Sequence, residues 1–335
     1  MSEPDQPPTP DRLPDLLEEG AYEETVACLD RLDAADTETR KRVLRAVRDV
    51  ATDRPRAIED LTASLSTFLT DDDRAVKLTT AKLFVTLAQS EPEIVVPVVD
   101  ALAERLADEE VFYYVRARSA EALGYVGRDH PEAVSDPEIL ADFRIGLSFD
   151  EPEVKEKLAK ALECVSLGDP GRLRHQVESL AEHLDDDGDL VRYHLCTALT
   201  AVGCEDPAKL AAARAALGDR LSDESEDPYI RGRAAEALGL FGRVDGDYVS
   251  PPDAVDVDDE DAADFVASRV AFLRGAREDK SGDEKREVAT LDGLRDSTEG
   301  VAETMTTTDG EECPHCGLAL PESGPPMCPR CGVPR

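Results

Sequence analysis

The sequence predicts an all-α fold, a solenoid of about six stacked helix pairs followed by a small cysteine module at the C-terminus. Six segments superpose on one pattern, and their starts are separated by 37, 39, 39, 37 and 39 residues. Each segment has small or apolar residues five, seven and eight positions after its first residue, which is a helical spacing. Each also follows a short acidic turn, so the repeating unit is helix, turn, helix. The segments start at Thr39, Val76, Val115, Val154, Val191 and Ile230.

Composition favours a folded protein adapted to concentrated salt. The 335 residues include 74 acidic and 38 basic side chains, giving a net charge of −36, and only nine of the basic residues are lysines. Such a charge makes a chain repel itself in dilute buffer, but molar salt screens it, because the Debye length there is about 3 Å. A disordered acidic chain is the alternative, but the acids are spread among regularly spaced apolar residues. We therefore expect a halophilic protein whose charge serves solubility.

The N-terminus, residues 1–12, is acidic and rich in proline, and we expect it to be disordered. It has no basic region followed by an apolar one, so it does not have the pattern of a secretory signal. No stretch approaches the roughly 18 to 20 apolar residues that span a bilayer. These observations predict a cytoplasmic protein with no membrane partner.

Residues 13–243 are expected to form the solenoid. Several first helices of the pairs begin with Asp-Pro, as at 136–137, 169–170 and 206–207, where Asp caps free N–H groups and Pro at the first helical position costs nothing. The unit resembles the HEAT repeat and the related repeat of the phycobilisome-lyase group, over roughly residues 14–243. The resemblance rests on the acidic turn, the Val or Ile after it, the following basic residue and an A-x-A-L-G ending, clearest at 115–127 and 230–242. It implies a curved array with a long concave surface.

Two columns of basic residues run through the segments. The second position is always basic, and the resemblance implies a structural ladder here, because HEAT-like proteins commonly pair this residue with the acidic turn of an adjacent repeat. The ladder consists of Arg40, Lys77, Arg116, Lys155, Arg192 and Arg231. Two positions further on, five of six residues can carry positive charge. This second column consists of Arg42, Thr79, Arg118, Lys157, His194 and Arg233.

The second column lies off the apolar face of each predicted helix, so we expect it to point outward. One interpretation is that its cations pair with nearby carboxylates and keep the repeats in register. The other is a cationic strip for an acidic partner, either protein or nucleic-acid phosphate. The first repeat is the densest in basic residues, so a functional strip should matter most at that end.

The character of the chain changes after the repeats. Residues 244–276 read as an acidic, proline-bearing connector followed by a capping helix over 262–276. Residues 277–312 are polar and mostly lack periodicity, so we expect a linker with room for one short helix.

Residues 313–335 contain two C-P-x-C-G units separated by eleven residues. Two residues between the cysteines of each unit let both sulfurs point at one ion, so the four thiolates predict one tetrahedral site. The ligands would be Cys313, Cys316, Cys328 and Cys331. This segment resembles the short zinc ribbons found at protein ends, and we expect one structural zinc ion, with iron or a redox pair as alternatives. A module this small cannot bury an apolar core, so the metal is expected to supply its folding free energy.

No catalytic signature stands out. None of the five histidines is followed by Glu, as the di-iron enzymes among HEAT-like arrays would require, and no glycine-rich phosphate loop or G-x-S-x-G is present. The sequence favours a non-enzymatic scaffold that binds a protein partner and has no small-molecule substrate. Two alternatives stay open: a nucleic-acid-associated factor, and an enzyme like the bilin lyases.

Overall fold

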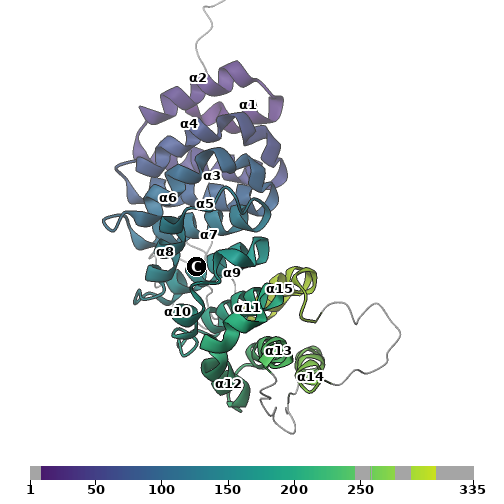
Figure 1. The fold of residues 1–335 in the computed structure, drawn as a ribbon. Helices are drawn as coiled ribbons and strands as arrows, with labels where there is room; N and C mark the ends of the chain where they lie inside the picture. The colour runs from purple at the N-terminus through teal and green to yellow at the C-terminus, as the bar shows by residue number, and fades with distance from the viewer. Residues whose placement is uncertain (1–8, 246–256, 258, 276–287, 307–335) are drawn as a thin grey trace, which may run out of the picture.

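The computed structural model describes residues 9–245, 257, 259–275 and 288–306, and these parts of the chain contain helices and no strand. The prediction of an all-α solenoid is confirmed: helix pairs stack side by side from the N-terminal end to α13 (Figure 1). No helix of the described residues is long and apolar enough to cross a membrane.

The second helix of each pair is long and regular. Five of them have 17 residues and the last has 18. They are α3 (Thr37–Asp53), α5 (Arg74–Ser90), α7 (Tyr113–Asp129), α9 (Pro152–Gly168), α11 (Asp189–Glu205) and α13 (Pro228–Asp245). Each packs against the next in chain order, so the six helices form one continuous layer. We call the surface of this layer that faces away from the first helices the second-helix face.

The first helices are shorter and often begin as a 3₁₀ turn at a proline, as at Pro55–Leu61, Pro92–Ile94 and Pro207–Ala213. Their α-helical parts are α1 (Leu13–Glu19) with α2 (Tyr22–Asp33), then α4 (Thr62–Ser66), α6 (Val99–Ala107), α8 (Pro137–Gly146), α10 (Val177–Ala181) and α12 (Arg214–Ser222). The acidic turns between the helices of a pair have a local role. Asp73, for example, accepts hydrogen bonds from the backbone N–H groups of Ala75 and Val76 and so caps α5.

One apolar core runs from Leu13 to Leu273 without interruption. Close helix packing in the middle of the array depends on Gly124, because a Cβ atom there would lie 2.6 Å from the Cα atom of Ala161. Since α7 and α9 approach this closely, their backbones leave no room for a side chain at that position.

Most of the stretch 262–276, where we expected a capping helix, lies in α14 (Glu260–Leu273), which packs against α13. The rings of Phe265 and Phe272 lie over Gly232 and Gly239 of α13, where any side chain would collide with them. Residues 1–8 lie outside the described residues. Residues 10–12, which we expected to be disordered, form a 3₁₀ turn, Pro10–Arg12, and the thiol of Cys28 donates to the carbonyl of Thr9 beside it.

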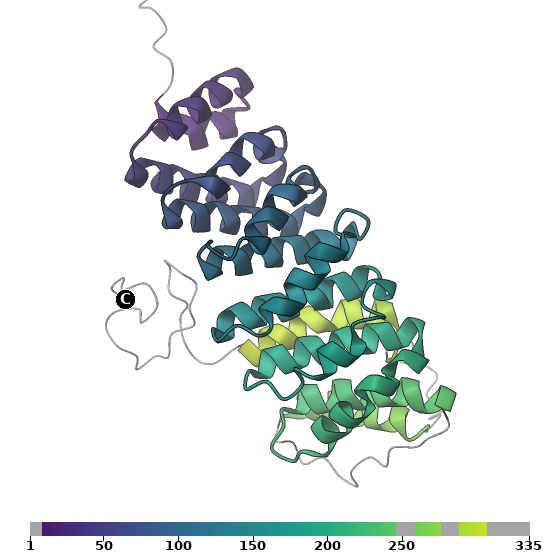
Figure 2. The same cartoon turned by 60° about the vertical axis from the view of Figure 1, so that its left-hand side comes forward.

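The expected linker over 277–312 needs a correction. Residues 291–306 form a four-turn helix, α15 (Leu291–Thr306), which lies alongside α11 and α9 on the second-helix face (Figure 2). Its apolar side chains, Leu291, Leu294, Val301 and Met305, are few and separated by small or polar residues, so the sequence shows only a weak stripe. Packing against a distant part of the chain, and not its own pattern, makes the helix stable.

The candidate partner-binding face

The basic ladder lies between the repeats. Arg40 Nε is 2.8 Å from Asp71 Oδ2, Lys155 Nζ is 2.5 Å from Asp186 Oδ2, and Arg192 contacts Glu226 at 2.6 Å. Each of these carboxylates belongs to the acidic turn of the following repeat.

The remaining ladder residues use the backbone or lie at the surface of α5. Arg116 Nε donates to the carbonyl of Leu106 at 2.8 Å, and its guanidinium lies over the Phe149 ring. Arg231 Nε reaches the carbonyl of Leu221 at 3.4 Å. Both carbonyls lie near the end of the first helix of the same repeat, so these arginines tie the two helices of a pair together. Lys77 is half-buried on α5.

The expectation that the second column points outward is wrong for three of its members. The Arg42 side chain is 63% exposed, but His194 and Arg233 are buried, the latter with 0% exposure. Thr79 is buried too and donates to the carbonyl of Ala75. For His194 and Arg233 the physical reason is that α15 covers the second-helix face at the C-terminal end of the array, whereas Thr79 is a short side chain that bonds its own helix.

Carboxylates on the same face pair with the column. Arg118 Nη1 is 2.5 Å from Glu121 Oε2, and Lys157 Nζ is 3.6 Å from the other oxygen of Glu121. His194 Nδ1 lies 2.8 Å from Glu163 Oε2. Burial by itself would raise the pKa of Glu121, but Lys157 and Arg118 outweigh it and lower the pKa to about 2.

The last member of the column lies in a buried cluster of charges. Glu236 accepts from Arg233 at 2.8 Å and from Arg269 of α14 at 2.9 Å, and neither the Arg233 nor the Glu236 side chain is exposed. Burial lowers the pKa of Arg269 to about 10 in spite of Glu236. The pKa of Glu236 is lowered: burial opposes this, and Arg233 and Arg269 outweigh burial. The cluster therefore holds two cations and one anion away from water.

Helix α15 and the residues just before it supply further hydrogen-bond partners to this cluster. Arg233 Nη2 donates to Ser297 Oγ at 2.8 Å and to Thr298 Oγ1 at 3.1 Å. The backbone N–H of Ala289, two residues before α15, donates to Glu236 Oε1 at 2.6 Å. These bonds supply partners that the array itself does not offer to its buried charges.

A small apolar contact fixes α15 in the groove between α9 and α11. Leu294 is fully buried against Leu167 and Ala201, with Leu291 and Cys204 at the edge. Arg295 Nε donates to the carbonyl of Leu167 at 2.9 Å, near the C-terminus of α9. Because the last carbonyls of a helix lack partners within it, Arg295 satisfies an acceptor that would otherwise need water.

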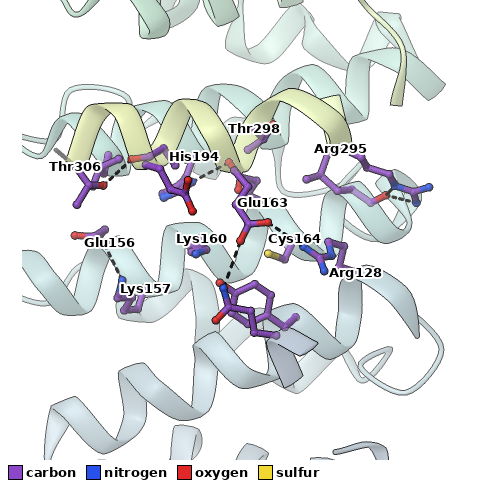
Figure 3. Close-up of a pocket in the computed structure, with 17 residues that line it drawn as sticks. Arg128, Glu156, Lys157, Lys160, Glu163, Cys164, His194, Arg295, Thr298 and Thr306 are labelled. Carbon is purple, nitrogen blue, oxygen red and sulfur yellow. Dashed lines mark hydrogen bonds and ion pairs between the residues drawn. The ribbon is translucent and has the colours of Figure 1, made fainter. Parts of the chain in front are cut away.

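A cavity of about 510 Å³ lies beside α15. Its floor is α9, with Lys157, Lys160 and Cys164, and one wall is α7, with Tyr125 and Arg128. The opposite wall is α15 from Arg295 to Thr306 (Figure 3). Lys160 Nζ lies 4.9 Å from the centre of the Tyr125 ring. Burial would lower the pKa of Lys160, but Tyr125 and Glu121 raise it above its ordinary value, so the amine carries its charge.

The part of the second-helix face that α15 leaves uncovered is basic. From α3 to α9, the positions three and six residues after each segment start hold six basic residues, one threonine and one glutamate. We call these six the basic strip: Arg42, Arg45, Lys82, Arg118, Lys157 and Lys160. All are half-buried except Arg42, which is exposed and paired with Asp11.

The four cysteines predicted to bind zinc, at 313, 316, 328 and 331, lie outside the described residues. Within the described ranges, no group of three or more His, Cys, Asp or Glu side chains could hold a metal. Burial raises the pKa of the Cys164, Cys196 and Cys204 thiols to about 12, which favours their protonated form.

Several residues of this face escaped the sequence reasoning: Glu121, Glu236, Lys82, Lys160 and the whole of α15. The Arg118–Glu121 and Arg233–Glu236 pairs each have a spacing of three, which places both charges on one side of a helix. That spacing was a usable signal in the sequence. The surface on which α15 packs left no such signal, because the contacts of α15 join residues as many as 210 positions apart.

Comparison with solved structures gives helical repeat proteins. An engineered protein superposes with a TM-score of 0.58 at 20% sequence identity, over 90% of this chain and 81% of that one. Another engineered protein gives 0.55 at 21% identity, over 64% of this chain and 96% of that one. A designed armadillo repeat protein gives 0.50 at 14% identity, over 69% of this chain and 98% of that one. No protein-family model matches the sequence, and neither does any curated protein. These likenesses establish a helical repeat fold.

Proposed function

We propose that this protein is a non-enzymatic scaffold that binds a protein partner on its second-helix face. The observation that carries the proposal is that this face already binds a helix, α15, from a distant part of the same chain. Three successive second helices contribute to the surface on which α15 packs: Leu167 of α9, Ala201 of α11 and Arg233 of α13. Grooves between stacked helices accept amphipathic helices in this way in many protein complexes.

The array offers more of this surface than α15 uses. The second helices α3, α5 and α7 have the same length as α9 and α11, and each packs against the next, so the same face continues towards the N-terminus. A repeat array builds an extended binding surface by adding such grooves in one direction. A partner segment can therefore lie on the face next to α15 without displacing it.

We further propose that Cys313, Cys316, Cys328 and Cys331 bind one structural zinc ion and form a second contact for the same partner. The paired C-x-x-C spacing supports zinc, and four thiolates close the coordination shell. Only six residues separate the end of α15 from Cys313, and a chain of that length spans at most about 25 Å. This short separation supports a second contact near the face, since two linked weak contacts combine as a high effective concentration.

The zinc proposal is tested by the metal content of the purified chain. We expect one zinc per chain in the wild type and none when Cys313 and Cys316 are both replaced by Ser. A matched Cys196→Ser variant, changed at a buried core thiol, should keep its zinc. Full zinc content in the double variant would contradict the assignment.

The scaffold proposal is tested by affinity capture of the tagged protein from a salt-adapted host, kept at native salt throughout. Half of the eluate is treated with nuclease, and both halves are analysed by mass spectrometry and ultraviolet absorbance. Protein partners that survive nuclease support the proposal. The basic strip makes nucleic acid the second candidate, and partners that vanish with nuclease would favour it. A coloured protein with an attached pigment would favour a lyase instead.

A further inference from the structure

We propose that the basic strip on α3 to α9 binds an acidic helical segment of a partner protein, lying beside α15. The inference rests on the proposed function and specifies the chemistry of the partner. Six of the eight strip positions are basic in a chain whose net charge is −36. Basic residues in so acidic a chain are expected to be paired and scattered, and their concentration on one face indicates an anionic ligand.

Within the described ranges, the cations on α7 and α9 share a small number of carboxylates. Glu121 is shared between Arg118 and Lys157, and Glu156 contacts Lys157 as well. No ion pair is seen for Lys160 among the described residues, and its ammonium group lies at the floor of the cavity, 4.9 Å from the centre of the Tyr125 ring in the wall. A charged amine held there is a specific anchor for a carboxylate that enters from outside, since a lysine binds an anion as a point charge.

Helix α15 shows what kind of segment this face accepts. It carries four acidic residues, Asp292, Asp296, Glu299 and Glu303, against one arginine. Glu299 reaches towards the uncovered part of the face, where it lies 4.0 Å from Arg128 and accepts from Gln89 at 3.5 Å. An acidic helix therefore already meets the border of the strip, and the cavity lies on that same side of α15 (Figure 3).

The spacing of the cations matches a helix. Arg42 and Arg45 lie three residues apart on α3, as do Lys157 and Lys160 on α9, which is a rise of about 4.5 Å along the helix axis. Acidic residues three or four positions apart on a helix of the partner are separated by nearly the same rise. The acids of α15 follow this spacing, with steps of four, three and four residues. A partner helix that lies parallel to α3 or α9 would therefore carry its carboxylates at the same spacing as the amine and guanidinium groups of the basic strip.

A nucleic acid fits the same strip less well. Single strands gain affinity by stacking bases on aromatic rings, but the ring in the wall of the cavity, Tyr125, has the Lys160 ammonium group over it. A polyanion would also meet the negative charge of the rest of the chain along its whole length, whereas a helix of a few turns meets only the strip.

The experiment is photo-crosslinking with the full-length chain at native salt. A benzophenone amino acid replaces Gln89, an exposed residue of α5 that lines the cavity. In a control chain it replaces Ala63, an exposed residue of α4 among the first helices. After illumination in a nuclease-treated host extract, the crosslinked peptides are sequenced by mass spectrometry. We expect peptides with several acidic residues at spacings of three and four from position 89, and none of them from position 63.

Charge variants show whether the strip causes the binding. Lys82→Gln with Lys160→Gln should reduce crosslinking at position 89 at least tenfold. Arg174→Gln with Lys209→Gln removes the same charge near the first helices and should leave it unchanged. Thermal melts at native salt check that both double variants are folded.

Each outcome separates the inference from the scaffold proposal. Crosslinks to segments that are not acidic, or crosslinks that survive in the Lys82 and Lys160 variant, would overturn the inference and leave the scaffold intact. No crosslinked protein at position 89 would overturn the inference alone, because affinity capture tests the scaffold proposal separately. Nucleic acid recovered from untreated extract in place of any protein would overturn both.

Discussion

The two ends of the second column show the same repeat position in opposite environments. At the N-terminal end, Arg42 is exposed on α3 and pairs with Asp11, which is exposed too. At the C-terminal end, Arg233 is completely buried on α13, between Glu236, Tyr193 and two hydroxyl groups of α15. The two residues have the same place in the repeat, the same side chain and the same helix face.

The difference comes from what lies on top of the face. An exposed ion pair gains little, because water and salt screen it. A buried charge must be paired and hydrogen-bonded, because its loss of hydration is otherwise uncompensated. In the described structure, α15 and α14 cover the C-terminal end of the column and make it a buried cluster, whereas Arg42 at its N-terminal end is exposed.

We expect the largest effect on stability from Glu236→Gln, at the buried end of the column. The change leaves Arg233 and Arg269 buried without their carboxylate, and we expect it to lower the free energy of unfolding by about 3–5 kcal/mol. Urea unfolding at native salt measures the loss. The matched change at the open end, Glu38→Gln, removes an exposed partner of Lys41 and should have no measurable effect. Equal losses at both positions would contradict the contrast between the two halves.

Acid should weaken the middle of the array through Glu121. Its pKa is lowered from 4.5 to about 2 in the folded state, so the stabilisation is complete above pH 4.5 and is lost as the pH falls through 2. A shift of this size corresponds to about 3 kcal/mol. We therefore expect wild type to be more stable than Glu121→Gln at pH 6 by about this amount, and the gap to close towards pH 2.

Urea unfolding of both proteins from pH 6 to pH 2 checks this expectation. Glu156→Gln, a change at the half-buried acid beside Lys157, serves as the control. Its free energy of unfolding should depend on pH in the same way as that of wild type. A gap between wild type and Glu121→Gln that stays constant with pH would show that the carboxylate is not held in its charged form.

Leu294→Ala tests whether α15 stabilises only its own half. Removing a fully buried leucine costs about 2 kcal/mol or more, but the loss here cannot exceed the free energy of docking α15, since the helix can simply detach. Hydrogen exchange should become faster in α15 and in the parts of α9, α11 and α13 beneath it. Exchange in α3 and α5 should not change. Faster exchange throughout the array would mean that the two halves unfold as one unit.

We expect the smallest change in stability from a substitution that alters the distance between α7 and α9. Gly124→Ala adds a Cβ atom 2.6 Å from the backbone of Ala161 and should cost about 1 kcal/mol, because α7 and α9 must move apart. Gly218→Ala is the matched control: no atom lies within 4 Å of its added Cβ, so better helix propensity should stabilise α12 slightly. Thermal melts compare the two. Stabilisation by both changes would mean that the close approach of α7 and α9 is not required.

The sequence predicted the array well because its signals are local. Acidic turn, Val or Ile, basic residue and small-residue ending recur within each unit, and the geometry of one unit determines the next. Burial of the second column was not predictable in this way. Whether Arg42 or Arg233 meets water depends on α14 and α15, which follow the repeats and carry weak patterns of their own. The candidate site was therefore foreseen as a line of cations, but not as a face divided between a covered and an open half.

The long-range contacts of α15 also set the order in which the chain can fold during synthesis. Contacts between successive repeats join residues such as Arg40 and Asp71, 31 positions apart, so each repeat can stack soon after it leaves the ribosome. Thr298 follows Arg233 by 65 positions, and at 5–20 residues per second the ribosome needs roughly 3 to 13 s to make that stretch. During this time Arg233 lacks the hydroxyl partners that α15 supplies, although α14 can already provide Arg269 to Glu236. The burial of Arg233 is thus among the last events of folding, and a chain that stops before α15 has all its repeats but keeps the whole second-helix face open.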